Sequence, residues 1–169
     1  MNSKRKSNVV LIGMSGAGKS TLGVLLAKSL GKSFLDTDLL IQQKEGMLLQ
    51  QILDLRGSEF FLALEEEVIA SLEAENCVIA TGGSVVYSQK AMHALQKNAT
   101  VVYLDVDYEE IAKRLSNITT RGIVFKGSST LRSVYEERLP LYQKYADLTL
   151  QCPHANIEAS VEQIVKALR

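Results

Sequence analysis

The stretch from Val9 to Thr21 constrains the fold of this chain more than any other part of its sequence. It opens with the apolar run Val9-Val10-Leu11-Ile12, which is typical of a buried β-strand. The next eight residues, Gly13 to Ser20, read GMSGAGKS and match the pattern G-x-x-x-x-G-K-[ST] at every position. In this pattern the backbone N–H groups of a loop surround phosphate groups. The lysine reaches the β- and γ-phosphates, and the following hydroxyl is available to Mg²⁺.

The residues after this loop have the periodicity of a helix. Apolar side chains recur at Leu22, Leu25, Leu26 and Leu30, and Gly31 stands where a helix C-cap is expected. Strand, glycine loop and helix thus occur in the order that points a helix N-terminus at bound phosphate. A turn without a ligand would have no use for Lys-Ser-Thr in this register, so we predict a nucleoside triphosphate site. Its expected contacts are Gly13, Ser15, Gly16, Ala17, Gly18, Lys19, Ser20 and Thr21.

Length, charge and composition exclude several classes of protein. The 169 residues are enough for one domain with a core. The 19 Lys and Arg balance the 19 Asp and Glu, which argues against the basic surface of a nucleic-acid-binding protein. No apolar run approaches the roughly 18 to 20 residues of a membrane span, and the N-terminus lacks the apolar segment of a secretory signal. We therefore expect a cytoplasmic protein that binds neither nucleic acid nor membrane.

The cysteines and histidines give no indication of a metal centre. Cys77 and Cys152 form no close-spaced metal-binding motif, and we expect both to be buried or incidental thiols. His93 and His154 are far apart in the sequence, and we expect both at the surface.

Apolar strand-like runs alternate with helix-like segments along the whole chain. After the first strand, such runs occur at 33–35, 77–80, 100–105 and 148–150, and each is followed by a segment with helical features. This alternation predicts one α/β domain over residues 1–169, with a five-stranded parallel sheet and helices on both faces.

Three details of the segments between the strands are also predicted. Gly57 begins a long amphipathic helix, whose acidic run Glu65-Glu66-Glu67 we interpret as its solvated face. Pro140 is expected to kink or interrupt the helix that begins near Leu131. The segment at about 116–130 is rich in Asn, Thr, Ser and Gly, and a polar segment of this length between helices indicates a mobile lid.

Polar or small residues follow three of the predicted strands, at the edge where parallel α/β sheets bind ligands. Asp36-Thr37-Asp38 ends the second strand; a carboxylate here could bind Mg²⁺ or a substrate hydroxyl, and Thr37 or Asp38 could cap the next helix. Gly82 and Gly83 follow the third strand and either permit close approach of a ligand or form an ordinary tight turn. Asp105 ends the fourth strand and is a rival to Asp36 as a metal ligand.

Arginines matter because phosphoryl transfer depends on positioning and on neutralising charge. The candidates are Arg114, Arg121 and Arg138, and the lid context favours Arg121. A GTPase would carry an Asn-Lys-x-Asp motif for guanine, which the sequence lacks, and the D-x-x-G match at 54–57 has no apolar strand before it. Size, charge balance and the lid instead favour a kinase of a small molecule or of a nucleoside monophosphate.

Together these motifs resemble those of the shikimate kinase family over nearly the whole chain. The resemblance rests on the glycine-lysine loop, Asp36-Thr37-Asp38, the segment 57–65, Ala80-Thr81-Gly82-Gly83, Arg121, and Arg138-Leu139-Pro140-Leu141-Tyr142. It implies a P-loop kinase fold like that of nucleoside monophosphate kinases, and a monomer. It also implies transfer of phosphate from MgATP to a ring hydroxyl, with shikimate as acceptor and shikimate 3-phosphate as product.

The resemblance implies roles for individual residues as well. Lys19 would bind the β- and γ-phosphates, and Ser20 and Asp36 would bind Mg²⁺, which favours Asp36 over Asp105. Asp38 would contact the substrate hydroxyls and accept the proton. The remaining implied contacts are Gly82 and Gly83 in the substrate pocket, Arg114 against adenine, Arg121 as the lid arginine, and Arg138 on the substrate carboxylate.

Three positions depart from the family pattern. Leu62 stands where an arginine that pairs with the substrate carboxylate normally follows the phenylalanine, Ser84 replaces a third glycine, and Gly122 replaces a proline. Arg138 could still bind a carboxylate alone, or Arg56 could substitute for the missing arginine. Otherwise the acceptor is a related hydroxylated molecule with a different anionic end. Two further hypotheses are a catalytically silent nucleotide-binding protein and a nucleoside monophosphate kinase.

Overall fold

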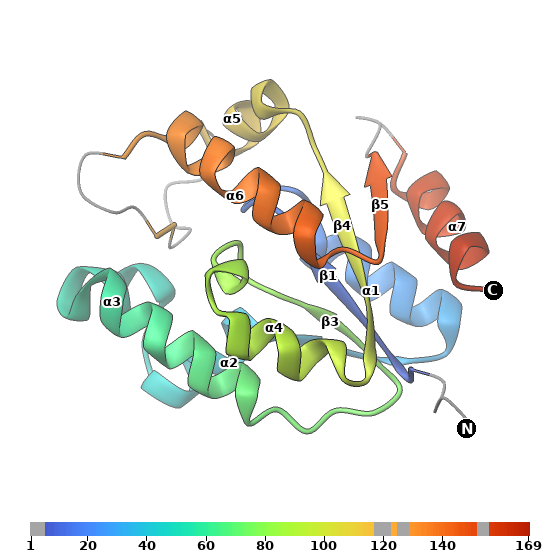
Figure 1. Ribbon diagram of the computed structural model, residues 1–169, viewed down its shortest axis with the longest axis horizontal. Coiled ribbons are helices and arrows are strands. Elements are labelled where there is room, and N and C mark those ends of the chain that lie inside the picture. Colours follow the sequence, from blue (N-terminus) through green and yellow to red (C-terminus); the bar gives the residue numbers. More distant parts are fainter. Residues whose placement is uncertain (1–5, 117–122, 125–128, 152–155) are drawn as a thin grey trace.

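Parallel strands form the centre of the computed structural model, which describes residues 6–116, 123–124, 129–151 and 156–169 (Figure 1). The sheet in these residues has five strands in the order β2-β3-β1-β4-β5, and every neighbouring pair is parallel. The strands are β1 (Asn8–Ile12), β2 (Ser33–Asp36), β3 (Cys77–Ala80), β4 (Ala99–Asp105) and β5 (Leu148–Gln151). The predicted α/β class and five-stranded parallel sheet are therefore confirmed.

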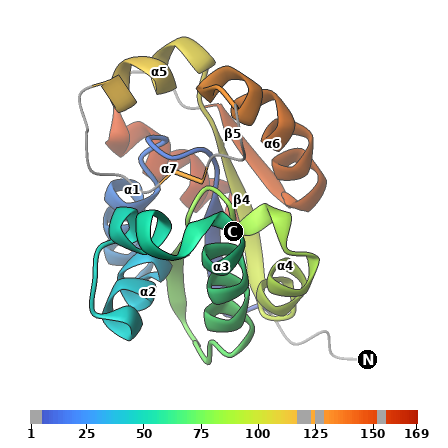
Figure 2. The ribbon, with the colours of Figure 1, turned by 90° about the vertical axis from the view of Figure 1, so that its left-hand side faces the viewer.

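Helices cover both faces of this sheet. They are α1 (Lys19–Leu30), α2 (Thr37–Glu45), α3 (Leu49–Ala70), α4 (Gln89–Gln96), α5 (Tyr108–Ser116), α6 (Leu131–Tyr145) and α7 (Ile157–Leu168), and a short 3-10 helix, η1 (Val85–Tyr87), precedes α4. α1 and α7 pack side by side on one face, whereas α4 and α6 cover the other, with α3 beside α4 (Figure 2).

The central strand β1 is buried along its whole length. Val10, Leu11 and Ile12 have no exposed surface. Because helices cover both faces of the sheet, a central strand needs apolar residues at consecutive positions and not only at alternate ones. A second, smaller group of buried residues lies where α2 packs against α3, beside the end of β2. Its members are Ile41, Leu49, Ile52, Phe61, Leu64 and Val124.

The strand register brings three segments together at one edge of the sheet. Leu11 of β1 pairs with Ala80 of β3, and Ala80 also pairs with Asp36 of β2. The glycine loop, the start of α2 and the turn after β3 therefore all begin at the same carboxyl edge. This is the edge at which open parallel sheets bind ligands.

Two predictions about individual helices can be compared with the structure. α3 has a non-helical residue at Gly57, with φ 81° and ψ 172°, so a helical segment begins where we predicted. α6 runs through Pro140 as one helix, so of the two predicted effects, a kink or an interruption, the interruption does not occur. Pro140 lacks the N–H that would bond to the carbonyl of Glu136, but both residues lie on the exposed side of α6, where water can reach that carbonyl.

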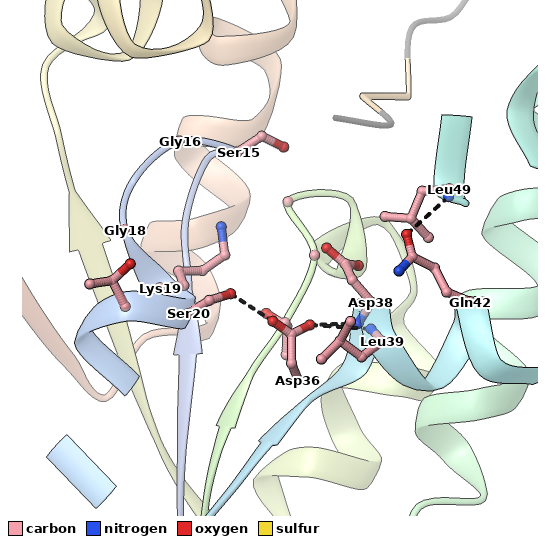
Figure 3. Close-up of a pocket in the computed structure, with 14 residues that line it drawn as sticks. Ser15, Gly16, Gly18, Lys19, Ser20, Asp36, Asp38, Leu39, Gln42 and Leu49 are labelled. Atoms are coloured by element: carbon pink, nitrogen blue, oxygen red, sulfur yellow. Dashed lines mark hydrogen bonds between the residues drawn. The ribbon is translucent and has the colours of Figure 1, made fainter. Parts of the chain in front are cut away.

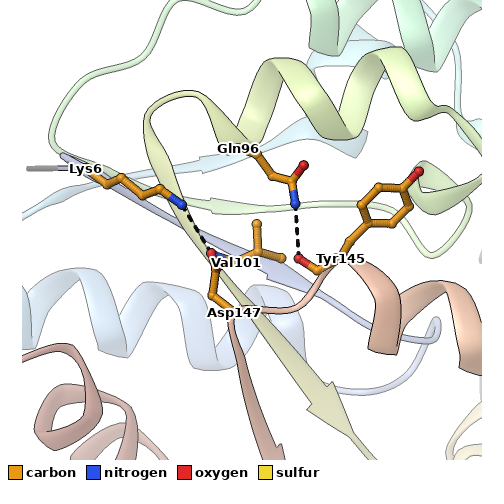
Figure 4. A network of polar contacts seen from close by, with 5 residues as sticks. All are labelled: Lys6, Gln96, Val101, Tyr145 and Asp147. Atoms are coloured by element: carbon orange, nitrogen blue, oxygen red, sulfur yellow. Dashed lines mark hydrogen bonds and ion pairs between the residues drawn. The ribbon is translucent and has the colours of Figure 1, made fainter. Parts of the chain in front are cut away.

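Asp147 fixes the start of β5 to the neighbouring strand (Figure 4). The backbone N–H of Val101 donates to Asp147 Oδ2 at 2.8 Å, and the N–H of Asp147 donates to the carbonyl of Val101 at 2.8 Å. Lys6 Nζ lies 3.4 Å from the same carboxylate, and Gln96 Nε2 donates to the carbonyl of Tyr145 at 3.4 Å. These contacts anchor the chain between α6 and β5 near the amino end of β4, away from the glycine loop.

The structure describes one of the two cysteines and one of the two histidines. Cys77 is buried and His93 is exposed, as we predicted, whereas Cys152 and His154 lie outside the described residues. In the described part of the chain, no helix combines the length and apolar character needed to cross a bilayer.

Candidate active site

A cavity of about 260 Å³ opens at the carboxyl edge of the sheet, between the start of α1, the start of α2 and the turn after β3 (Figure 3). Most of the residues predicted to bind nucleotide, metal or acceptor share it. Its lining consists of Ser15, Gly16, Gly18, Lys19, Ser20, Thr21, Asp36, Asp38, Leu39, Gln42, Leu49, Thr81, Gly82 and Gly83. Of these, Leu39, Gln42, Leu49 and Thr81 were not among the predicted site residues.

Two members of the predicted nucleotide-binding set shape the glycine loop from behind and do not line the cavity. Ala17 is buried, and its N–H donates to the carbonyl of Met14 at 3.0 Å. Gly13 lies against β4, where a Cβ at residue 13 would be only 2.8 Å from the carbonyl oxygen of Leu104. The rest of the loop leads directly into the first turn of α1. The backbone N–H groups of that turn have no partners within the helix, so they can donate to bound phosphate.

The ammonium group of Lys19 is held inside the loop. Lys19 is buried, and its Nζ donates to the carbonyls of Gly13 at 2.6 Å and Met14 at 2.8 Å. A buried charge needs such partners. These bonds aim the ammonium at the centre of the loop, where phosphate oxygens would lie (Figure 3).

Ser20 and Asp36 place two oxygens side by side at the end of β2. Ser20 Oγ donates to Asp36 Oδ2 at 2.6 Å, while Asp36 Oδ1 accepts from the N–H of Asp38 at 2.9 Å (Figure 3). Asp36 is thus the N-cap of α2, in place of Thr37 or Asp38, the two residues that could have capped this helix. A hydroxyl and a carboxylate beside a phosphate loop are oxygen ligands of the kind that Mg²⁺ prefers, so these residues fit that ion.

Asp38 and the turn after β3 form the opposite side of the cavity. A Cβ at residue 82 would lie 2.7 Å from Asp38 Oδ1, and one at residue 83 would lie 2.8 Å from an amino group of Arg138. Both distances are too short for a real side chain. Gly82 and Gly83 are therefore required by close approach within the protein, and they add no side chains of their own to the cavity.

Glu65 is a charged residue of this region that the sequence interpretation missed. We had assigned it to the solvated face of α3, but it is only 2% exposed. Ser84 Oγ donates to its Oε1 at 2.7 Å, and its Oε2 lies 2.9 Å from the position of a Cβ at residue 82. The pKa of Glu65 is raised to about 7, chiefly because the carboxyl is buried; the hydrogen bond from Ser84 is the largest effect that lowers it, the Asp38 carboxylate adds a lesser increase, and Arg138 and Lys19 lower it slightly.

The helical period of α3 contains the signal that would have found Glu65. Glu65 follows the buried Phe61 by four residues and precedes the buried Ile69 by four. Residues four apart share one face of a helix, so Glu65 lies on the apolar stripe. The acidic neighbours Glu66 and Glu67 obscured this pattern.

Arg138 lies behind the turn at Gly83 and does not line the cavity. Its side chain is buried; Nε donates to the hydroxyl of Tyr87 at 3.2 Å and an amino group donates to the carbonyl of Val124 at 3.1 Å. The Tyr142 hydroxyl donates to the carbonyl of Gly83 at 2.6 Å. α6 thus holds this turn from behind, and the binding of a substrate carboxylate by Arg138 stays a prediction.

The other predicted arginines and the rival carboxylate have different surroundings. Arg114 of α5 donates to the carbonyl of Gly16 at 3.0 Å and pairs with Glu110 at 2.9 Å, so it lies against the outside of the glycine loop. Arg121 and most of the predicted lid lie outside the described residues, as does Gly122. Asp105 accepts from Gln151 Nε2 at 2.6 Å and is not part of the cavity lining. Arg56 is exposed and stacks on Phe60, with 5.0 Å to the ring centroid.

Leu62 and Ser84, two of the departures from the family pattern, line the same second cavity. This cavity of about 340 Å³ lies on the far side of Glu65 and is also lined by Ala63, Glu66, Tyr87 and Ser88. Ser84 has φ −88° and ψ −4°, an ordinary right-handed conformation, so the chain accommodates a side chain there without strain.

Comparisons with known proteins give one consistent family for this chain. The family model described as shikimate kinase matches residues 15–169. The shikimate kinase of Dehalococcoides mccartyi is 33% identical over 168 residues, which cover 98% of this chain and 96% of that protein. The shikimate kinase of Francisella tularensis subsp. novicida is 38% identical over 164 residues, covering 95% of this chain and 93% of that protein.

Solved structures give the same result for the fold. The shikimate kinase of Acinetobacter baumannii in complex with shikimate superposes with a TM-score of 0.86 at 28% identity, covering 96% of this chain and 92% of that one. The shikimate kinase of Aquifex aeolicus has a TM-score of 0.81 at 33% identity, with 95% of each chain covered.

Proposed function

The chain belongs to the shikimate kinase family, and on that premise we propose that it transfers the γ-phosphoryl group of ATP to a ring hydroxyl of shikimate, giving shikimate 3-phosphate and ADP. The observation that carries this proposal is that a complete phosphate loop, the Asp38 carboxylate and the Gly82–Gly83 turn line one cavity. A protein that only bound a nucleotide would have no need of a carboxylate and two adjacent glycines facing its phosphate loop.

The nucleotide half of the cavity uses the residues of the glycine loop. The Lys19 ammonium, which already lies inside the loop, would exchange backbone carbonyls for β- and γ-phosphate oxygens. Ser20 and Asp36 would hold Mg²⁺, which when bound neutralises charge on the phosphates. Arg114, beside Gly16, is proposed to lie along the adenine, and Arg121 is proposed as the lid arginine.

Asp38 is the proposed general base of the acceptor half. Its carboxylate takes the proton of the acceptor hydroxyl, whose oxygen forms a bond to the γ-phosphorus. The bond from that phosphorus to the β–γ bridging oxygen breaks, and ADP leaves with its electron pair. The absence of side chains at Gly82 and Gly83 lets the ring of the acceptor approach this carboxylate.

The carboxylate of the acceptor is assigned to Arg138. With Leu62 in place of a second arginine, the acceptor loses a charge-assisted contact worth about 1.5–3 kcal/mol. This corresponds to roughly a ten- to hundredfold difference in affinity. We therefore expect shikimate to bind more weakly here than in a relative that carries both arginines.

The proposal also includes a cellular location and an oligomeric state. Use of ATP as the donor supports a cytoplasmic location. A monomer is supported by the fact that one chain supplies both the nucleotide half and the acceptor half of the cavity.

A steady-state assay of ADP release tests the function. We expect release that depends on shikimate and is lost in Lys19→Ala. Asp38→Asn should lower kcat by about 10²- to 10⁴-fold with little change in the KM for ATP, because only the base is removed. Release with another hydroxylated acid, or with AMP or CMP, and none with millimolar shikimate would refute the assignment of the acceptor. No acceptor-dependent release at all would leave a catalytically silent nucleotide-binding protein.

A further inference from the structure

Tyr87 makes two kinds of contact with Arg138, the arginine assigned to the acceptor carboxylate. The hydroxyl of Tyr87 accepts from Arg138 Nε at 3.2 Å, and the guanidinium carbon lies 5.3 Å from the centroid of the Tyr87 ring. Arg138 is 1% exposed, and within the described residues no carboxylate forms an ion pair with it. A buried cation therefore needs other polar partners, and Tyr87 supplies one of them.

Glu137 sets the direction in which the Tyr87 hydroxyl donates. This hydroxyl donates to Glu137 Oε2 at 3.2 Å. Its one hydrogen is therefore directed at the carboxylate, and its lone pairs are available to the Nε–H of Arg138, which can only donate. Glu137 is exposed, so the carboxylate of this chain of hydrogen bonds lies at the surface while the guanidinium stays buried.

Two hydrogen bonds fix the plane of the guanidinium group. Nε donates to Tyr87, and Nη2 donates to the carbonyl of Val124 at 3.1 Å. Because the N–H groups of an arginine lie in one plane at fixed angles, these two bonds also fix the direction of Nη1. Nη1 lies 2.8 Å from the position that a Cβ at residue 83 would take, and Ser15 Oγ lies 3.1 Å from the same position. Nη1 thus borders the bare side of Gly83, which Ser15 of the glycine loop also borders.

We propose that Tyr87 is a positioning residue for the acceptor: its hydroxyl holds the guanidinium of Arg138 so that Nη1 is directed past Gly83 toward the acceptor carboxylate. This proposal rests on the proposed function, in which Arg138 binds that carboxylate. Gly83 lines the main cavity and Arg138 does not, so an acceptor in the cavity would meet Arg138 beside this glycine. Without the bond to Tyr87, the guanidinium could turn about its bond to Val124, and Nη1 would lose this direction.

Leu62 increases the dependence on this one arginine. Leu62 and Tyr87 line the same second cavity of about 340 Å³, and Leu62 brings no charge to it. The proposed function therefore assigns the acceptor carboxylate to a single cation. A change in the orientation of Arg138 should appear directly in the affinity for the acceptor, because no second arginine at position 62 shares the carboxylate.

Steady-state kinetics of Tyr87→Phe provide the first test. The substitution keeps the ring beside the guanidinium and removes only the hydroxyl. We expect the KM for shikimate to rise about tenfold, the loss of one charge-assisted hydrogen bond, with the KM for ATP unchanged. Tyr135→Phe is the matched control and should leave both KM values unchanged. Tyr135 is also half-buried, but its hydroxyl donates to the carbonyl of Val106 at 3.1 Å.

A double-mutant cycle shows whether Tyr87 acts through Arg138. In Arg138→Met no guanidinium remains to be positioned. Adding Tyr87→Phe to this variant should therefore change kcat/KM for shikimate by less than about twofold, against about tenfold in the wild-type background. The same tenfold effect in both backgrounds would mean that Tyr87 affects the acceptor without Arg138, and the proposal would be wrong.

The ¹⁵N–¹H signal of Arg138 Nε tests the positioning without any turnover. It is assigned by its loss in Arg138→Met. We expect its hydrogen to exchange with water about tenfold faster in Tyr87→Phe than in the wild type, and at the wild-type rate in Tyr135→Phe. Equal exchange in the wild type and Tyr87→Phe, or an unchanged KM for shikimate in Tyr87→Phe, would overturn the proposal. A wild type that shows this contrast in exchange yet releases no ADP with shikimate would instead refute the proposed function.

Discussion

A single buried carboxyl links the stability of this protein to pH. Glu65 has a pKa of about 7 in the folded state against a usual value of 4.5. The folded state therefore binds this proton more tightly than the unfolded chain does. The stability that this group contributes is fully present below pH 4.5 and is lost as the pH rises through 7, a loss of about 3 kcal/mol.

Glu65→Gln should remove this dependence, because the amide keeps the shape of the side chain and does not ionise. Between pH 5 and pH 8 the free energy of unfolding of the variant should gain about 2–3 kcal/mol relative to the wild type. Urea denaturation at both pH values measures this difference. The exposed neighbour Glu67 is the control, and Glu67→Gln should show almost no such gain. Parallel pH dependences of wild type and Glu65→Gln would show that Glu65 ionises normally.

At the scale of residues, the sequence predicted those side chains whose position follows from a strand end. Asp36, Asp38, Gly82 and Gly83 all come directly after apolar runs, and the parallel register brings them together. Glu65 was missed because an acidic triplet on a helix is usually solvated. Its burial depends on where α3 packs, which sequence neighbours do not reveal.

At the scale of elements, α6 holds the turn after β3 in place through side-chain contacts. Tyr142 reaches from this helix to the carbonyl of Gly83, and Arg138 packs behind the same residue. Tyr142→Phe would leave a buried carbonyl without its donor, so we expect a loss of about 1–3 kcal/mol in the free energy of unfolding. The KM for the acceptor should rise while the KM for ATP stays constant, because the turn belongs to the acceptor half.

Tyr145→Phe is the matched control for this substitution. Tyr145 lies on the same helix and is also buried, but no hydrogen bond of its hydroxyl occurs within the described residues. Thermal unfolding and steady-state kinetics of the two variants measure the contrast. Equal effects of the two substitutions would mean that the bond to Gly83 does not hold the turn.

Elements were predicted best where the sequence marks their ends. Gly31 ends α1, and Gly57 separates the two parts of α3, as the sequence predicted. The interruption that is one of the two effects predicted for Pro140 does not occur, because the effect of a proline depends on whether the freed carbonyl faces water. That property is set by the packing of α6 and is invisible in the residues around the proline.

At the scale of the whole molecule, the sheet joins the parts of the chain that build the site. The alternation of strands and helices predicted five parallel strands, but it could not give their order. That order, β2-β3-β1-β4-β5, places β1 at the centre and puts β3 between β1 and β2. The glycine loop therefore faces both Asp36 and Gly82, although these residues are far apart in sequence.

The Asp147 network at the other end of the sheet should contribute stability without affecting catalysis (Figure 4). Asp147→Ala removes the charged acceptor of the Val101 N–H, and we expect a loss of about 1–3 kcal/mol in the free energy of unfolding. Both KM values should be unchanged, since the cavity lies at the opposite edge. Lys6→Ala should cost less than about 1 kcal/mol, because its ion pair is exposed. Altered KM values in Asp147→Ala would mean that the two edges of the sheet are coupled.

The central claim is that the γ-phosphoryl group of ATP reaches shikimate in this cavity. ³¹P NMR of the protein with MgATP and shikimate tests this claim most directly, because it identifies the product as well as the loss of ATP. The account predicts a phosphomonoester signal, assigned to shikimate 3-phosphate, that grows in equal amount with ADP and is absent in Lys19→Ala. ADP accompanied by inorganic phosphate alone, or ATP left intact, would contradict it.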